Sequence, residues 1–126
     1  MQTIFMAFIT GTIDAVDFYC RAFGATAENC FKAADGDDFY AHAEIVRDGR
    51  TFLALSERAH YGRDFTNGDS AEFWVIFDDE ASLNQAYAVL GEDADIHEPL
   101  GPCEWCRALA SLTDKYGVNW LLSAGY

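Results

Sequence analysis

The chain has 126 residues and a formal net charge of −13, because 21 Asp and Glu residues outnumber eight Lys and Arg residues. This charge argues against binding to nucleic acids or anionic membrane surfaces, both of which attract basic proteins. With 51% hydrophobic residues the chain can build a packed core, yet it has no apolar run near the roughly 20 residues of a membrane span.

The first half of the chain has the pattern of one strand, one helix and three further strands. Hydrophobic periodicity predicts strands at 3–9, 27–33, 39–47 and 51–56, and a helix at 13–23. The apolar stripe predicted on this helix consists of Ile13, Val16, Cys20 and Phe23. Thr12 is expected as the N-cap of the helix and Gly24 as the residue that ends it. Asp48 and Gly49 are typical of a hairpin turn between the last two strands.

The second half repeats this order. Strands are predicted at 71–77, 94–98, 107–113 and 118–123, and a helix at 81–90. One face of the helix is predicted to carry Leu83, Ala86, Tyr87 and Leu90. Asp78 and Asp79 suit its N-terminus, and Gly91 follows its end. Two βαβββ halves predict an α+β protein, with one domain over 1–126 built from modules at about 1–57 and 71–126.

Three segments carry a resemblance to a known superfamily. They are 17–24, which begins Asp-Phe-Tyr and ends Phe-Gly, 40–44, which reads Tyr-Ala-His-Ala-Glu, and 114–120, which reads Asp-Lys-Tyr-Gly-Val-Asn-Trp. With the βαβββ order, they resemble the glyoxalase/bleomycin-resistance/extradiol-dioxygenase (vicinal oxygen chelate) superfamily, and most of all its PhnB-like branch. The resemblance implies a curved mixed sheet around a cavity, with the helices on its outer face, and a homodimer.

Enzymes of this superfamily typically hold a divalent metal through His, Gln or Glu on the first and last strands of each module. In this sequence the corresponding positions are Phe5, Ala54, Phe73 and Leu121, none of which can bind a metal. Neighbouring positions do not supply a ligand set either: they hold Ile4, Met6, Leu53, Leu55, Trp74, Trp120 and Leu122. We therefore expect no metal and no cofactor.

Strand alternation predicts which side chains face the cavity. Placing Phe5 toward the cavity places Ala7 and Ile9 there too, and leaves Ala41, Ala43 and Ile45 facing the helix. The predicted ligand-binding residues are Phe5, Tyr40, His42, Glu44, Phe73, Trp105, Arg107 and Asn119. Trp74 and Trp120 are expected in the core, on the helix side.

Three further features have more than one interpretation. His42 and Glu44 share a strand face, so they are candidates for acid–base catalysis or ligand contact, or a simple structural pair. Cys103 and Cys106 form a lone CxxC that is incidental, redox-active or half of a zinc site. The loop 56–65, with two arginines and His60, is a lid, an anion site or a plain connector.

The sequence favours a small-molecule-binding protein with an aromatic cavity. No basic N-terminal region typical of a signal peptide is present, so a cytoplasmic location is expected. The acidic charge suits sequestration of a bulky cationic drug, as in bleomycin-resistance proteins. One alternative is a lyase, isomerase or dioxygenase of the superfamily that uses His42 and Glu44. Another is a structural or regulatory dimer without catalysis.

Overall fold

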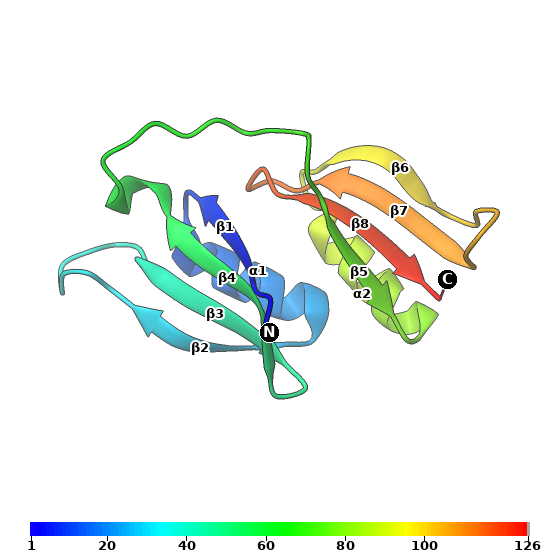
Figure 1. Ribbon diagram of the computed structural model, residues 1–126, viewed down its shortest axis with the longest axis horizontal. Coiled ribbons are helices and arrows are strands. Elements are labelled where there is room, and N and C mark those ends of the chain that lie inside the picture. Colours follow the sequence, from blue (N-terminus) through cyan, green and yellow to red (C-terminus); the bar gives the residue numbers. More distant parts are fainter. Residues whose placement is uncertain (126) are drawn as a thin grey trace. The chain divides into compact units, whose positions relative to one another are not determined.

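The computed structural model describes residues 1–125, which form two compact units, 1–66 and 67–125. The first unit contains β1 (Phe5–Ile9), α1 (Thr12–Phe23), β2 (Thr26–Phe31), β3 (His42–Arg47), β4 (Arg50–Glu57) and the short 3-10 helix η1 (Arg58–His60). The second contains β5 (Phe73–Phe77), α2 (Glu80–Leu90), β6 (Asp95–Gly101), β7 (Ala108–Thr113) and β8 (Asn119–Ala124). The predicted βαβββ order is confirmed in both units (Figure 1).

Each unit has one four-stranded mixed sheet, and the two sheets have the same topology. The strand orders are β1-β4-β3-β2 and β5-β8-β7-β6. In each sheet the first strand lies parallel to the last, and the other neighbours are antiparallel. The helix connects the first strand to the second strand, which lies at the opposite edge of the sheet. It crosses over the sheet and covers one of its faces. We call the opposite face of each sheet its open face.

Helix α1 buries a different stripe from the predicted one. Of the predicted residues, only Phe23 is fully buried, while Ile13 is 38% exposed. The buried side chains are Ala15, Phe18, Tyr19, Ala22 and Phe23. Two large rings at adjacent positions, Phe18 and Tyr19, therefore set which side of the helix packs on the sheet. In α2 the prediction holds better, since Leu83, Ala86 and Leu90 are all fully buried.

The start of α1 is capped by Glu57 of the neighbouring strand β4 rather than by Thr12, which corrects the sequence prediction. Thr12 is the first helical residue, and Gly11 before it has a φ of 95°. The carboxylate of Glu57, at the end of β4, accepts bonds from the backbone N–H groups of Gly11 (3.0 Å) and Thr12 (2.9 Å). It also accepts a bond from the Thr12 hydroxyl at 3.1 Å. A buried carboxylate thus neutralises the positive end of α1.

The Thr12 hydroxyl also explains why β3 begins at His42 and not at 39. It accepts a bond from the Tyr40 backbone N–H at 2.8 Å and lies 2.9 Å from the Tyr40 carbonyl. These groups of Tyr40 are therefore occupied outside the sheet.

Other local signals in the sequence are confirmed. Asp79 caps α2 by accepting a bond from the Ser82 N–H at 2.7 Å, and Gly24 ends α1 with a left-handed φ of 58°. Asp48 and Gly49 have φ angles of 53° and 75°, as a type I′ hairpin turn requires. Neither helix in the described residues has the length and apolar character needed to cross a membrane.

Candidate functional site

The open face of the first sheet brings together the polar pair that the sequence singled out. Ala43 and Ile45 are fully buried on the α1 side, so the alternating residues His42 and Glu44 point to the open face. Glu44 pairs with Ala54 on β4, and Ala54 pairs with Met6 on β1. In this row across three strands, the carboxylate of Glu44 lies next to the small side chain of Ala54. The flexible apolar side chain of Met6 follows on β1.

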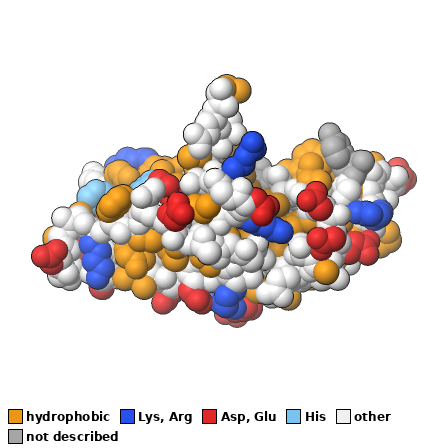
Figure 2. Space-filling view, turned by 90° about the horizontal axis from the view of Figure 1, so that it is seen from below, with side chains coloured by type: hydrophobic (Ala, Val, Ile, Leu, Met, Phe, Trp, Pro, Cys, Tyr) orange, Lys and Arg blue, Asp and Glu red, His pale blue; other side chains and the backbone are white. Residues whose placement is uncertain are grey.

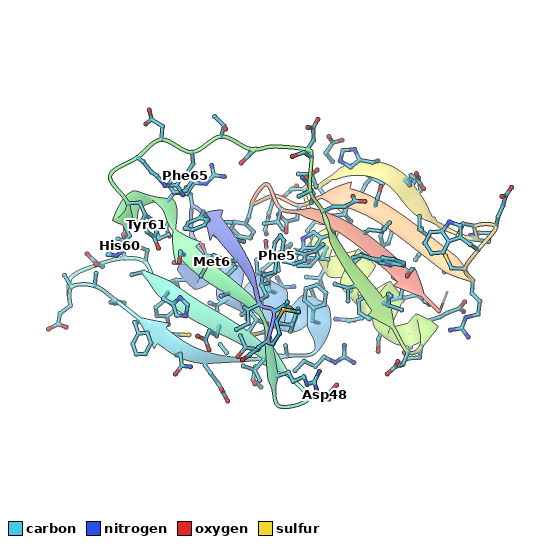
Figure 3. The ribbon with its side chains drawn as sticks, viewed as in Figure 1. Phe5, Met6, Asp48, His60, Tyr61 and Phe65 are labelled. Carbon is cyan, nitrogen blue, oxygen red and sulfur yellow. The ribbon has the colours of Figure 1, made fainter. Side chains whose placement is uncertain are left out.

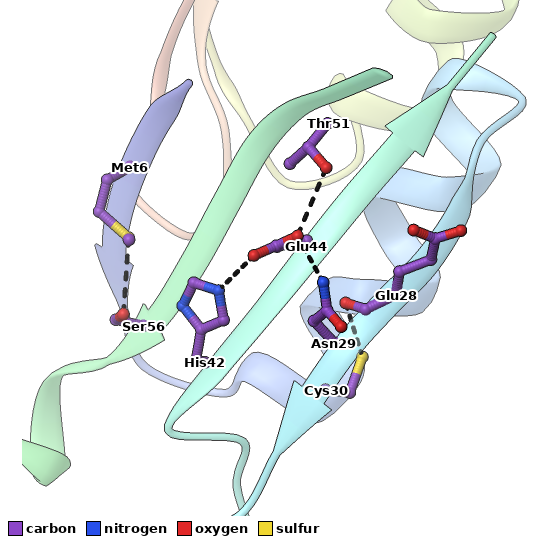
Figure 4. A network of polar contacts seen from close by, with 8 residues as sticks. All are labelled: Met6, Glu28, Asn29, Cys30, His42, Glu44, Thr51 and Ser56. Carbon is purple, nitrogen blue, oxygen red and sulfur yellow. Dashed lines mark hydrogen bonds and ion pairs between the residues drawn. The ribbon is translucent and has the colours of Figure 1, made fainter. Parts of the chain in front are cut away.

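Glu44 is the centre of a hydrogen-bond network on this face (Figure 4). Its Oε2 lies 2.8 Å from the Nε2 of His42, and its Oε1 accepts a bond of 2.9 Å from the Asn29 amide. The Thr51 hydroxyl lies 3.4 Å from the same Oε1. The hydrogen bond with His42, followed by that from Asn29, lowers the pKa of Glu44 below its ordinary value. Glu44 is therefore held as a carboxylate.

An irregularity in β2 delivers Asn29 to this network. The register between β2 and β3 shifts between Glu28 and Phe31, and Asn29 within this bulge has a φ of 51°. Asn is one of the few residues that adopt this left-handed conformation at low cost. The bulge redirects a side chain, as bulges near functional sites often do.

The network fixes the orientation of His42. Because Glu44 is a carboxylate, the hydrogen on this bond resides on Nε2 of the imidazole. This bond orients the ring and leaves Nδ1 as the nitrogen that does not contact Glu44. In the neutral ring Nδ1 is a hydrogen-bond acceptor. The side chain of His42 is 33% exposed, so solvent reaches part of the ring. The pair can accept a proton or a hydrogen bond from a ligand.

Apolar side chains border the polar pair. The ring of Phe31, which is 58% exposed, stacks on His42 with centroids 6.4 Å apart and planes 20° apart. Met6 is 40% exposed and its sulfur accepts a bond of 3.5 Å from the Ser56 hydroxyl. A few polar groups within an apolar surround are typical of small-molecule sites.

A cluster of aromatic and basic residues, which the sequence did not predict, lies at the end of β1. We call Phe8, Tyr61, Phe65, Arg58 and Arg63 the aromatic–arginine cluster. The Phe8 ring stacks on Phe65 at 5.3 Å and meets Tyr61 edge-on at 5.4 Å. Arg63 lies 4.1 Å from the centre of the Phe65 ring, and Arg58 donates a bond of 2.8 Å to the Phe8 carbonyl. Figure 3 shows Tyr61 and Phe65 on the segment that follows β4.

The cluster changes the interpretation of the loop 56–65. Cation–π contacts and a backbone hydrogen bond tie its arginines to β1, so this part of the loop is packed on its own unit. The available signal was the spacing of aromatic and basic residues in that loop, but only the fold places Phe8 beside them.

On the face seen in Figure 2, acidic and basic side chains are scattered among hydrophobic ones rather than gathered in one patch.

The expected orientation of Phe5 is wrong. Phe5 pairs with Leu53 and Ala7 pairs with Leu55, both of which are fully buried under α1. Phe5, Ala7 and Ile9 therefore face the helix, and Met6 and Phe8 face the open side. The error arises because both alternating sets on this strand are apolar, so a shift of one residue leaves the pattern unchanged.

The second sheet shows the same reversal. Phe73 pairs with the buried Trp120 and stacks on it at 5.3 Å, so it faces the helix. Trp74 pairs with Leu121, is 42% exposed, and donates a bond of 2.9 Å to the Ser123 hydroxyl. The prediction of a buried Trp120 is confirmed, whereas that of a buried Trp74 is wrong.

The remaining predicted ligand residues have structural partners. Both donors of the Asn119 amide bond backbone carbonyls, those of Gly68 (2.7 Å) and Ala71 (3.0 Å). Its carbonyl accepts a bond of 2.7 Å from the Thr113 hydroxyl, so Asn119 anchors the chain before β5. The guanidinium of Arg107 packs against Gly125, where an added Cβ would lie 3.3 Å from it. Trp105 is 50% exposed and meets Trp74 edge-on at 5.7 Å.

Asp114 explains the terminal segment that carries the resemblance. Its Oδ1 accepts bonds from the N–H groups of Tyr116 (2.9 Å) and Val118 (3.1 Å), and its Oδ2 accepts one from the Trp120 indole (2.9 Å). Gly117 completes the turn with a φ of 87°. The segment is therefore a structural device that closes the β7–β8 hairpin.

The corrected faces also move the positions that correspond to the superfamily's metal ligands. At these positions, the open-face residues of the first and last strands are Met6 with Ala54, and Trp74 with Leu121. None offers an imidazole nitrogen, a carboxylate or a thiolate as a metal ligand. Within residues 1–125, no group of three or more His, Cys, Asp or Glu side chains is placed to hold a metal ion.

Comparison with solved structures gives the fold. No protein-family model matches the sequence, and no curated protein matches it. Protein PA1353 from Pseudomonas aeruginosa superposes with a TM-score of 0.83 at 22% identity, over 99% of this chain and 98% of that one. The PhnB protein from Bacillus cereus, described as a 3-demethylubiquinone-9 3-methyltransferase, gives 0.81 at 21% identity, over 99% and 100%.

A third structure carries the superfamily's name. A glyoxalase/bleomycin resistance protein/dioxygenase family enzyme from Burkholderia phytofirmans PsJN superposes with a TM-score of 0.68 at 11% identity, over 96% of this chain and 95% of that one. Identities this low establish the architecture and leave the reaction open. The chain therefore has the α+β fold of these structures, which is the glyoxalase-like fold that the sequence resemblance predicted.

Proposed function

We propose that the chain is a cytoplasmic small-molecule-binding protein that holds its ligand on the open face of the first sheet without a metal ion. The observation that carries this proposal is the His42–Glu44 pair, a carboxylate and an oriented imidazole 2.8 Å apart between exposed apolar side chains. Such a pair recognises a cation or a hydrogen-bond donor, and Phe31 and Met6 cover the apolar part of the same ligand.

The charge of the chain favours a cationic ligand. A net charge of −13 attracts cations over distances beyond direct contact, and Glu44 is the ionised group at the site itself. We therefore propose sequestration of a cationic aromatic drug, the role that the name bleomycin resistance describes. We further propose that the chain forms a homodimer, as the resemblance implies.

A second candidate function is supported by the geometry of the same pair. Glu44 orients His42 so that Nδ1 can act as a general base toward a bound substrate. A metal-independent isomerase or lyase would need this arrangement. We rank it second because two groups supply proton transfer but no stabilisation of the charge that develops in the substrate.

The test is a binding titration with metal-free bleomycin A2 as the probe. Calorimetry on the wild type is compared with His42→Ala and Glu44→Gln. His97→Ala is the matched histidine control, since His97 lies on β6 and bonds the Thr113 hydroxyl at 2.8 Å. We expect saturable binding that both site variants weaken at least about tenfold, the loss of one charge-assisted hydrogen bond. The control should bind as the wild type does.

Two results would overturn the proposal. One is that the wild type binds neither bleomycin nor any co-purified compound that native mass spectrometry detects. Equal binding by the wild type, the two site variants and the His97→Ala control would count in the same way. The other is a stoichiometric divalent metal in the purified wild type that both site variants lose. This second result would favour the enzyme instead of the metal-free binding protein.

A further inference from the structure

The loop between β6 and β7 brings two free thiols together outside the site described above. Cys103 and Cys106 flank a two-residue turn, closed by a bond of 3.3 Å from the Cys103 N–H to the Cys106 carbonyl. Their sulfur atoms lie 2.7 Å apart. The Cys106 thiol also contacts the Ala108 carbonyl at 3.4 Å. Both residues are partly exposed, so small reagents can reach them.

This separation fits a disulfide better than a shared metal ion. Two thiolates on one zinc ion, each about 2.3 Å from the metal, lie about 3.8 Å apart. A disulfide bond is about 2.05 Å long, and forming it from the present arrangement needs only a small movement of the two side chains. No further Cys, His, Asp or Glu among the described residues completes a metal site with them.

The two thiols also differ in character. Desolvation opposes ionisation of Cys103, but hydrogen bonds from Cys106 and the turn backbone outweigh it and lower the pKa of Cys103. Desolvation, followed by the hydrogen bond to Cys103, raises the pKa of Cys106 to about 11. Cys103 is therefore the better nucleophile of the two thiols.

We propose that Cys103 and Cys106 form a thiol–disulfide exchange site, which reacts with low-molecular-weight disulfides such as glutathione disulfide. The Cys103 thiolate attacks one sulfur of that disulfide, the S–S bond breaks, and glutathione thiolate leaves and takes up a proton. Cys106 then loses its proton to solvent and attacks the Cys103 sulfur, which expels the second glutathione. The two protein thiols are oxidised by two electrons, and the small disulfide is reduced to two thiols.

The crosslink has a structural consequence for the second sheet. The turn that it closes carries Trp105, whose ring contacts Trp74 on the open face of that sheet. Oxidation would restrict this turn and fix Trp105 relative to the rest of the loop. The site is independent of the proposed ligand site on the first sheet, so the two proposals stand or fall separately.

The experiment follows disulfide formation in glutathione buffers. Reduced protein is equilibrated at a series of glutathione ratios, quenched with acid, alkylated and analysed by peptide mass spectrometry. We expect a Cys103–Cys106 disulfide in a two-electron transition, while Cys20 and Cys30 stay alkylatable. These two thiols are the internal control, since desolvation raises the pKa of each.

Single variants identify the attacking sulfur. Cys106→Ser should accumulate a mixed disulfide of glutathione on Cys103, formed at least about tenfold faster than any adduct of Cys30. Cys103→Ser should lose this fast reaction, and a Cys20→Ser/Cys30→Ser double variant should form the loop disulfide normally. The proposal is overturned if excess glutathione disulfide yields no Cys103–Cys106 crosslink, or if Cys103 reacts no faster than Cys30.

Discussion

Asp114 offers the sharpest test of what holds the second unit together. Its carboxylate is 4% exposed and accepts hydrogen bonds from the Val118 N–H, at 3.1 Å, and the Trp120 indole, at 2.9 Å, both of which are buried. Asp114→Ala removes the acceptor of these two hydrogen bonds. Each unsatisfied buried donor costs about 1–3 kcal/mol, so we expect a loss of about 2–6 kcal/mol in the free energy of unfolding. The Tyr116 N–H is partly exposed, so water can replace its bond.

Asp114→Asn separates the two bonds. The amide oxygen can still accept from the backbone, but the amide nitrogen then faces the Trp120 indole donor. One buried donor is left unsatisfied, so the expected loss is about 1–3 kcal/mol, between wild type and Asp114→Ala. The matched control is Asp69→Ala, an exposed aspartate of the same unit, which should stay within about 0.5 kcal/mol of the wild type.

The assay is urea unfolding followed by tryptophan fluorescence. All three tryptophans of the chain, Trp74, Trp105 and Trp120, lie in the second unit, so the signal reports on that unit. The comparison is valid if the free energy of unfolding has the same dependence on urea concentration in all variants. The reasoning is refuted if Asp114→Ala loses less than about 1 kcal/mol, or if Asp114→Asn is as unstable as Asp114→Ala.

Two predictions concern the first unit. Glu57→Ala removes the acceptor of the Gly11 and Thr12 N–H groups. It should lower the free energy of unfolding by about 2 kcal/mol, measured by urea unfolding with circular dichroism. A change below about 0.5 kcal/mol would contradict the role of Glu57 as the cap. Hydrogen bonds from His42 and Asn29 lower the pKa of Glu44, so the stability they add is present above its ordinary value of 4.5 and is lost as pH falls through the lowered pKa. The urea midpoint of the wild type should therefore approach that of Glu44→Gln below pH 4.5, and a constant gap between them would refute the assignment.

Local sequence signals predicted the elements because they act over a few residues. The Asp48-Gly49 turn, the Asp79 cap and the left-handed Gly24 each depend on backbone preferences of neighbouring positions. The placement of His42 and Glu44 on one face follows from strand alternation alone, since the small apolar residue Ala43 separates them in β3. Both units were therefore predictable as βαβββ modules, and so was the polar pair at the candidate site.

Only the tertiary structure shows which face of each sheet the side chains of the first strand point to. Strands β1 and β5 are apolar on both faces, so their alternation is symmetric, and only pairing with the buried Leu53 and Trp120 shows that Phe5 and Phe73 face the helices. The same holds for contacts between distant residues. Glu57 caps a helix 45 residues earlier in the chain. Periodicity carries no information on such pairs, because they meet only when β1 and β4 lie side by side.

The sequence by itself thus determined the order of the elements, their turns, the Asp79 cap of α2 and the polar pair of β3. The tertiary structure decided which apolar face each helix covers, which carboxylate caps α1, and that Phe8 joins Tyr61 and Phe65 in the aromatic–arginine cluster. The physical reason is the range of the interactions. Backbone preferences act between neighbours in the chain, whereas burial and hydrogen bonding are decided by neighbours in space.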